Sequence, residues 1–292
     1  MRSRGKPQLG HTLVELLLTL GLASLLLLAA VASLATTARR SRDAQTTLEL
    51  AEAVGFSLDL LERAIRSAGS YGLATSQAPL AGSIAVGTAE PPELAVGGHC
   101  TPGLALDLTH PVQWRDWTQG PWPAGCAASP GGRGMPGSAV LVARRAVQAL
   151  SPGDRGVLWL ESSPIGAVVH RSAATHPPDL PATGVLPTPA VPARTRLEVE
   201  VYYVSRDSTG QRDWPSLRRK RLVGGTTGPR FEDEELVPGI VELTVIPRLM
   251  TPDGSARLLE VAVRAVSSRT RNRQREARRY VWIRNGAATP WP

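Results

Sequence analysis

Hydrophobic residues are concentrated near the N-terminus of the chain. Residues 16–38 form a run in which no side chain is charged. Its 23 residues exceed the roughly 20 that a helix needs to cross the hydrocarbon core of a bilayer. Arg39, Arg40 and Arg42 end the run and can lie among the lipid headgroups. The pattern predicts one membrane-spanning helix.

The helical period continues beyond Arg42, but only on one face. Apolar residues recur there every three or four positions, while acidic residues fall between them. Gly69 and Gly72 then supply a stop. We therefore predict one helix over residues 11–68, with a membrane half and an amphipathic half. The predicted apolar stripe consists of Ala44, Leu48, Ala51, Val54, Leu58, Leu61 and Ile65.

After residue 73 the pattern changes to short apolar or alternating segments between turn residues, which is typical of strands. The segment 197–203 alternates, which predicts a strand with one buried face, and we expect 138–149 to pair with 156–161. The fold class is therefore α+β, with a long N-terminal helix packed on an antiparallel β-sheet domain. The predicted strands lie at 83–86, 93–96, 138–149, 156–161, 197–203, 217–223, 240–246, 258–266 and 279–284.

Cys100 and Cys126 lie in a Gly- and Pro-rich region, residues 97–137, which we interpret as a long loop. Two cysteines in a chain that leaves the cytoplasm suggest one disulfide. Closing a loop of this size stabilises a fold by roughly 3 kcal/mol. A metal site that also uses His99 and His110 is the alternative, although the spacing matches no common zinc pattern.

The net charge of +8 comes almost entirely from arginine. Three positive charges precede residue 10, and without them the net charge is 8 − 3 = +5. A net charge of this size is compatible with anionic lipid, DNA or an acidic protein as partner. Residues 269–279 hold six arginines and one glutamate. We interpret this run as a solvated hairpin loop, with an acidic protein or DNA as alternative partners. Tyr280 and Trp282 alternate along a strand rather than forming a stacking track, so nucleic acid is not the partner we expect.

The sequence carries no motif of a known catalytic centre. Its five histidines lie in loops or near the N-terminus, and it lacks a phosphate-binding glycine loop, a nucleophile elbow and a zinc-protease helix. The acidic residues 232–235 lack the alternating ligand spacing of a calcium loop, so we interpret them as a charged turn. We expect no enzyme activity, no cofactor and no bound metal.

Glu15 lies inside the front of the apolar run. A carboxylate there is costly, about 2.5–3.5 kcal/mol at the bilayer centre and less near the interface. The preceding residues 1–10 are short, basic and free of acids, and end with Gly10. A secretory signal peptide cleaved near residues 32–35 would have a shorter apolar region, and a plain signal anchor would not require Glu15.

The segment from Gly10 to Glu15 reads G-H-T-L-V-E and resembles the prepilin cleavage motif of type IV pilins, in which Glu is the fifth residue after the cut. His11 stands where that family usually has Phe. The head of the chain resembles the PilW-like minor pilins in the order of several weak motifs, whereas residues 73–195 match nothing in that family. These motifs are RAIRSAGSYG at 63–72, VYYV at 201–204, SLRRKRL at 216–222, PGIVELTV at 238–245 and RNG at 284–286.

The resemblance implies a leader, residues 1–10, that a prepilin peptidase removes between Gly10 and His11, with N-methylation of His11. It implies a pilin helix over 11–68 and a periplasmic head over 69–292, with a single pass through the inner membrane and the N-terminus in the cytoplasm. Glu15 would meet the N-terminal amine of a neighbouring subunit during assembly.

The partners that the resemblance implies are other minor and major pilins, the inner-membrane assembly platform and a tip adhesin, and it implies a place at the pilus tip. A minor pseudopilin of type II secretion shares this architecture. The same pattern also leaves open a DNA-uptake pilin and a lone membrane-anchored binding module.

Overall fold

The structure is a computed structural model that describes residues 13–74, 80–81, 96–97, 100, 102–117, 134–148, 156–164, 166–170, 193–267, 273–286 and 288–290. It contains two compact parts, Met1–Glu49 and Leu50–Pro292. Helix α1 (Leu13–Ser67) contributes to both parts. The second part, called the head below, contains a short helix α2 (Pro102–Leu106) and all the strands.

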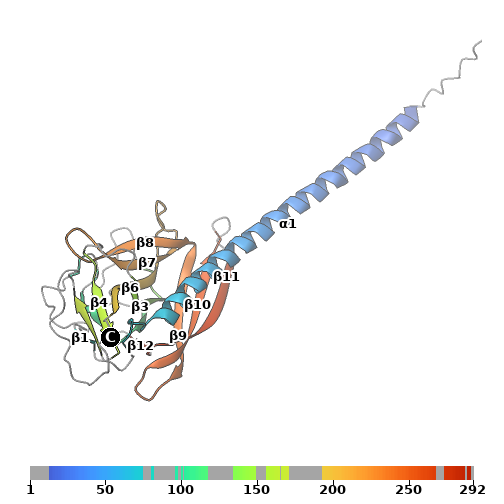
Figure 1. Ribbon diagram of the computed structural model, residues 1–292. Coiled ribbons are helices and arrows are strands. Elements are labelled where there is room, and N and C mark those ends of the chain that lie inside the picture. The colour runs from blue at the N-terminus through green and yellow to red at the C-terminus, as the bar shows by residue number, and fades with distance from the viewer. Residues whose placement is uncertain are drawn as a thin grey trace, which may run out of the picture. The chain divides into compact units, whose positions relative to one another are not determined.

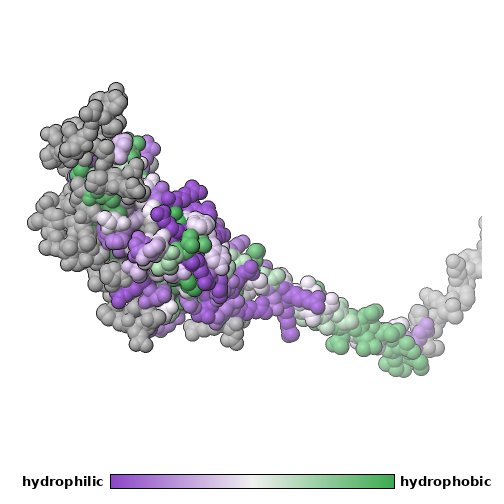
Figure 2. Space-filling view, turned by 90° about the horizontal axis from the view of Figure 1, so that it is seen from below, coloured by the Kyte–Doolittle hydropathy of each residue, from purple (hydrophilic) through white to green (hydrophobic). Residues whose placement is uncertain are grey.

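The first part of α1 is exposed and apolar. The helix is long and apolar enough to cross a membrane once, which agrees with the predicted span. Large leucine and valine side chains from Leu13 to Leu34 have between 55% and 76% of their surface exposed. The space-filling view shows hydrophobic residues covering this segment and hydrophilic residues following it (Figure 2). Such a surface needs lipid or other helices around it.

The second part of α1 is amphipathic and packs within the head. Val54, Leu58, Leu61 and Ile65 from the predicted stripe are buried. The prediction is wrong at Ala44, which is exposed, and at Leu48, which is 59% exposed, because the first buried apolar residue of the helix is Leu50. Figure 1 shows this half of the helix lying across β9, β10 and β11. The stripe therefore joins the helix to the sheet, as the sequence predicted, and it does so at the last strands.

Twelve strands form one mixed, curled sheet among the described residues. Its main order is β1-β5-β4-β6-β3-β2-β12-β10-β11, while β7 pairs with β6 and β8, and β9 pairs with β10. The strands are β1 (Leu80–Ala81), β2 (Val112–Trp117), β3 (Ser138–Val147), β4 (Trp159–Ser163), β5 (Gly166–His170), β6 (Ala193–Ser205), β7 (Ser216–Val223), β8 (Arg230–Pro238), β9 (Ile240–Met250), β10 (Ala256–Val266), β11 (Gln274–Trp282) and β12 (Ala288–Pro290).

The α+β class is confirmed, but the expected purely antiparallel sheet is wrong. β12 pairs with β2 in parallel, and β1 pairs with β5 in parallel. The parallel pairs arise because strands far apart in sequence lie beside each other, so no hairpin fixes their direction. Among the later strands, β7 and β8 continue from β6, while β9 joins β10.

Several strand predictions need correction. β3 and β4 do not pair with each other, because the 13-residue strand β6 lies between them and pairs with both. The region 97–137, expected to be loop, contains α2 and β2. The acidic residues 232–235 belong to β8 rather than to a turn. The predicted strand at 83–86 and most of the one at 93–96 lie outside the described residues.

The curled sheet separates two apolar cores. One core joins α1 to β9, β10 and one face of β2 and β3. The other joins α2 to β4, β5 and the opposite face of β3 and β6. Leu197, Val199 and Val201 face the second core, while Tyr202 and Val204 face the first. The prediction of one exposed face at 197–203 is therefore wrong, because both faces of β6 are covered.

The end of α1 is fixed by a close approach of the chain at Gly69. Gly69 has a φ of 75°, and its amide donates to the carbonyl of Arg144 over 2.8 Å. A Cβ atom at this position would lie 1.9 Å from the carbonyl oxygen of Asn285. Only glycine fits this turn. The helix stop is thus tied to β3 and to the segment after β11.

Candidate functional site

The N-terminal residues that the sequence predicts to be functional fall partly within the described part of the chain. Glu15 lies in the first turn of α1 and is exposed. A carboxylate there is favoured by the positive end of the helix dipole. Gly10 and His11 lie outside the described residues, so cleavage between them and N-methylation of His11 stay predictions.

Cys100 lies in the second core with 4% of its surface exposed, next to the residues of α2. Its predicted partner Cys126 lies outside the described residues, and so does His99. The disulfide therefore stays a prediction. His110, the fourth residue of the alternative metal site, binds Asp107 with 2.8 Å between Nδ1 and Oδ1.

A buried guanidinium organises the segment around α2. Arg144 on β3 has no exposed surface. Its Nε donates to the carbonyl of Leu104 over 2.8 Å, and its Nη1 donates to the carbonyl of His110 over 2.6 Å. Its Nη2 donates to Gln113 over 2.7 Å, and Gln113 donates in turn to Asp107 over 3.0 Å. The hydrogen bonds within this cluster take the place of those that the buried polar groups would otherwise make to water.

Asp107 completes this cluster as its carboxylate. Burial by itself would raise the pKa of Asp107, but hydrogen bonds from His110 and Thr109 outweigh burial and lower the pKa. The nearby charge of Arg144 adds to the lowering. The carboxylate is thus held ionised opposite the buried guanidinium. The arrangement positions the chain around α2, and its buried donors and acceptors are occupied by one another.

A second polar feature of the head is a ladder of opposite charges between β7 and β8. In register, Arg218 faces Glu235, Arg219 faces Glu234, Lys220 faces Asp233 and Arg221 faces Glu232. Arg218 Nε lies 2.7 Å from Asp233 Oδ1, and Arg219 Nε lies 2.7 Å from Glu234 Oε1. Opposite charges on facing strands stabilise pairing. The acidic cluster is therefore explained by the basic strand beside it.

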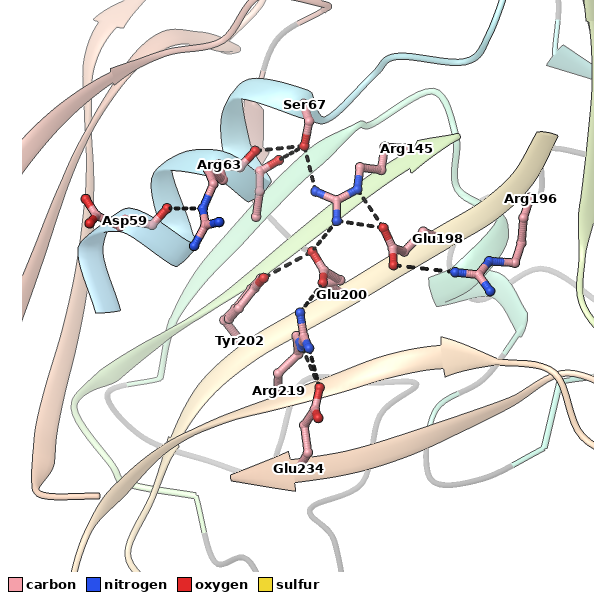
Figure 3. A network of polar contacts seen from close by, with 11 residues as sticks. Asp59, Arg63, Ser67, Arg145, Arg196, Glu198, Glu200, Tyr202, Arg219 and Glu234 are labelled. Atoms are coloured by element: carbon pink, nitrogen blue, oxygen red, sulfur yellow. Dashed lines mark hydrogen bonds and ion pairs between the residues drawn. The ribbon is translucent and has the colours of Figure 1, made fainter. Parts of the chain in front are cut away.

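The ladder continues across the sheet to the end of α1 (Figure 3). Arg219 Nη1 also donates to Glu200 on β6 over 2.6 Å. Arg145 on β3 lies 3.4 Å from Glu200 and donates to Glu198 over 2.7 Å. Arg145 Nη1 donates to the hydroxyl of Ser67 over 2.7 Å. One connected network thus links the last turn of the helix to the edge strand β8.

Lys220 is the buried member of the ladder, with 1% of its side chain exposed. Its Nζ lies 4.0 Å from Asp233 and 5.9 Å from the centre of the Tyr203 ring. Burial lowers the pKa of Lys220 to about 8, although Asp233 opposes this shift. Tyr203 donates to Asp233 over 2.5 Å, and burial raises the pKa of Tyr203.

The arginine run 269–279 is only partly a loop. Residues 268–272 lie outside the described residues, but residues from Gln274 onward form β11. Arg279 donates to Asp59 and, over 2.5 Å, to Glu62, both on α1. Arg278 pairs with Glu276 over 2.9 Å. The interpretation as a solvated loop is therefore wrong for the last residues of the run, which are ion-paired strand residues.

One feature of the head, the pairing of β7 with β8, was missed from the sequence although a signal for it exists. The strings RRKR at 218–221 and EDEE at 232–235 have equal length and opposite charge, which indicates a paired hairpin. Tyr280 and Trp282 alternate along β11 and are 57% and 56% exposed. Within the described ranges, no group of three or more His, Cys, Asp or Glu side chains is arranged to hold a metal ion.

No protein-family model, curated protein or solved structure matches this chain.

Proposed function

We propose that this chain is a minor pilin of a type IV pilus that primes pilus assembly after a prepilin peptidase cuts between Gly10 and His11. The observation that carries the proposal is the G-H-T-L-V-E segment directly before an apolar helix. The N-terminal region thus combines a basic leader, a small residue at the cut and a carboxylate at the fifth position after the cut. A plain membrane anchor requires none of the three.

The form of α1 supports this proposal. A pilin helix must first lie in lipid and later lie among other helices, while its second half carries a head domain. α1 is exposed and apolar at its start, and from Leu50 onward one of its faces is buried in the head. Its 55 residues are far more than one membrane span needs. The helix therefore has the length and the two surfaces that this role demands.

Glu15 gives the proposal a mechanism. Within lipid its carboxylate is costly, so the subunit gains when the charge meets a cation. Cleavage before His11 creates an N-terminal amine, and the same amine exists on every processed neighbour. An ion pair of about 4 Å is worth roughly 4 kcal/mol at an effective dielectric constant of 20. Such a pair would set the register of a new helix against the previous one.

The pairing of Arg278 and Arg279, the last two arginines of the run, favours assembly over DNA uptake. A DNA-binding track needs arginines that are free to neutralise phosphates. Arg279 is bonded to Asp59 and Glu62, and Arg278 is bonded to Glu276 and Glu260. These contacts compensate both guanidinium charges within the head. A minor pseudopilin of type II secretion is the alternative that the same architecture supports.

The test is the N-terminal residue of the protein after extraction from the membrane, measured by intact mass and by sequencing of the terminal peptide. The proposal expects a chain that begins at His11, with or without a methyl group. The matched control is Gly10→Val, which places a branched side chain at the cut and should leave residues 1–10 attached. A wild-type chain that begins at Met1 or near residues 32–35 would overturn the proposal.

A further inference from the structure

The face of β9, β10 and β11 that points away from the apolar core has an unusual composition. Leu259, Val261 and Val263 face the core that contains α1. The residues between them belong to the opposite face, called the outer face below. Pairing places three rows on it: Leu249, Leu258 and Trp282; Ile246, Glu260 and Tyr280; and Thr244, Ala262 and Arg278.

One end of the outer face gathers exposed apolar and aromatic side chains. In the described part of the head, six large hydrophobic residues are exposed, and three of them belong to the rows at this end. Tyr280 and Trp282 occur two residues apart on one strand, so their Cα atoms lie about 7 Å apart along it and their side chains share a face. The three residues are Leu249, Tyr280 and Trp282, with exposed fractions of 46%, 57% and 56%.

A polar groove of about 250 Å³ continues from the aromatic pair over the same face. Glu260 joins the two features, since it lines the groove and faces Tyr280 across the strands. Arg248 donates to Glu260 over 2.6 Å, and Arg278 lies 3.3 Å from Glu260. These arginines cover the carboxylate, which is only 1% exposed, while they remain 44% and 59% exposed themselves. Their remaining N–H groups are held in place at the surface.

The charges of the outer face balance. Three arginines (Arg248, Arg264 and Arg278) stand beside three glutamates (Glu242, Glu260 and Glu276), which gives 3 − 3 = 0. A polyanion such as DNA gains little from a face with no net positive charge. A purely apolar partner would bury these charged groups without new partners, which is costly. The face therefore suits a ligand that is uncharged, rich in hydroxyl groups and apolar on one side.

We propose that the outer face of β9–β11 binds a neutral carbohydrate chain, with sugar rings stacked on Trp282 and Tyr280 and hydroxyl groups bonded in the adjoining groove. The C–H groups on one side of a pyranose ring carry a slight positive charge, and the face of an aromatic ring carries a negative one. Hydroxyl groups both donate and accept, so they match neighbouring guanidinium and carboxylate groups. Two rings in line on one strand present successive stacking positions to consecutive sugars. The proposal does not depend on the function proposed above.

The test uses the full-length protein in lipid nanodiscs, so that no sugar-headed detergent competes. Neutral hexasaccharides of glucose, N-acetylglucosamine, mannose and galactose are titrated by calorimetry, with a single-stranded oligonucleotide as the charged comparison. At least one hexasaccharide should bind, and Trp282→Ala and Tyr280→Ala should each weaken its affinity by about tenfold or more, as for removal of a central aromatic contact. Trp282→Phe keeps a ring and should retain most of the affinity.

The matched control is Phe56→Ala, which removes an aromatic side chain that is 51% exposed on α1 and should leave sugar binding unchanged. Failure of all four hexasaccharides to bind would overturn the proposal. So would binding that survives in both alanine variants, or binding of the oligonucleotide alone. Circular dichroism of each variant separates a lost site from a lost fold, because both rings lie at the surface.

Discussion

Arg145 on β3 donates a hydrogen bond from Nη1 to the hydroxyl oxygen of Ser67, in the last turn of α1, over 2.7 Å. The same guanidinium pairs with Glu198 and Glu200 on β6. The end of the helix is therefore held by a side chain whose own position is fixed by two carboxylates. The contact connects the helix that would enter a filament with the centre of the head sheet.

Replacing Arg145 should destabilise the head. Arg145→Ala leaves the nearly buried carboxylates of Glu198 and Glu200 without this partner, and we expect a loss of about 2 kcal/mol. The loss should be smaller than for a fully buried pair, because Arg145 is 22% exposed. Ser67→Ala removes one hydrogen bond and should cost about 1 kcal/mol. Chemical unfolding followed by near-ultraviolet circular dichroism measures both, and equal losses would show that the carboxylates do not depend on Arg145.

Leu61 should contribute more to stability than any exposed residue of α1. Its side chain has no exposed surface within the first core, so Leu61→Ala should reduce the free energy of unfolding by about 2–5 kcal/mol. Phe56→Ala, on the exposed side of the same helix, should change it by less than about 0.5 kcal/mol. The comparison uses the same unfolding measurement. Similar losses in the two variants would contradict the orientation of the helix.

The helix was predictable because its signals are local. A charge-free run, a three-to-four residue period and Gly69 each act over a few residues, and the structure places the helix at Leu13–Ser67, within the predicted 11–68. The error at Leu48 has a different origin. Periodicity shows that one face is apolar, but it does not show where the covering sheet begins.

The sheet was less predictable because strand pairing is not local. The segment 197–203 alternates like a strand with one solvent-exposed face. In the structure it belongs to β6, which, like β3, is covered on both sides by separate cores. Glu198 and Glu200 tolerate burial because Arg145 and Arg219 neutralise them. An acidic residue in a strand usually indicates a solvent-exposed position, whereas Glu198 and Glu200 are buried beside arginines on the neighbouring strands.

The stability of the head should rise with pH between about 8 and 10. Burial lowers the pKa of Lys220 to about 8, below its unfolded value of 10.5. Between these values the unfolded chain binds more protons than the folded chain, so the free energy of unfolding increases with pH, by about 3 kcal/mol at most. Lys220→Met should remove most of this rise. A wild-type profile that stays flat or falls over this range would contradict it.

Above pH 10 the trend should reverse. Burial raises the pKa values of Tyr71, Tyr202 and Tyr203 above their ordinary value of 10.0. The unfolded chain then loses these phenolic protons before the folded chain does, and stability falls as the pH rises. Lys220→Met should still show this fall in stability above pH 10, because the three tyrosines are unchanged. The same variant therefore tests the lysine effect and serves as a control for the tyrosine effect. Unfolding titrations at several pH values measure both limbs.

The predicted disulfide has a simple test in the mass of the unreduced protein. A Cys100–Cys126 bridge predicts a chain without free thiols and a cross-linked peptide pair after digestion. Reduction, or Cys126→Ser, should destabilise the head by roughly 3 kcal/mol, because a long loop loses its closure. Cys126→Ser is the cleaner variant, since Cys100 lies in the core and its replacement would also disturb packing. Free thiols in protein isolated without reductant would contradict the bridge.

Substitution of Glu15 should affect assembly without affecting cleavage of the leader. Glu15→Val removes a carboxylate from the apolar run, so the variant should insert into the membrane at least as well as the wild type. The cut site at Gly10 is unchanged, and we expect a chain that still begins at His11. Without the carboxylate, the pairing with a neighbour's amine is lost, and the amount of protein recovered with sheared pili or with other pilin subunits should fall by more than about tenfold. Glu15→Asp keeps the charge on a shorter side chain and should retain part of this recovery. If Glu15→Val assembles as well as the wild type, the carboxylate has no role in docking, even when the chain begins at His11. If the variant is no longer cut, the peptidase instead requires Glu15 to recognise its substrate.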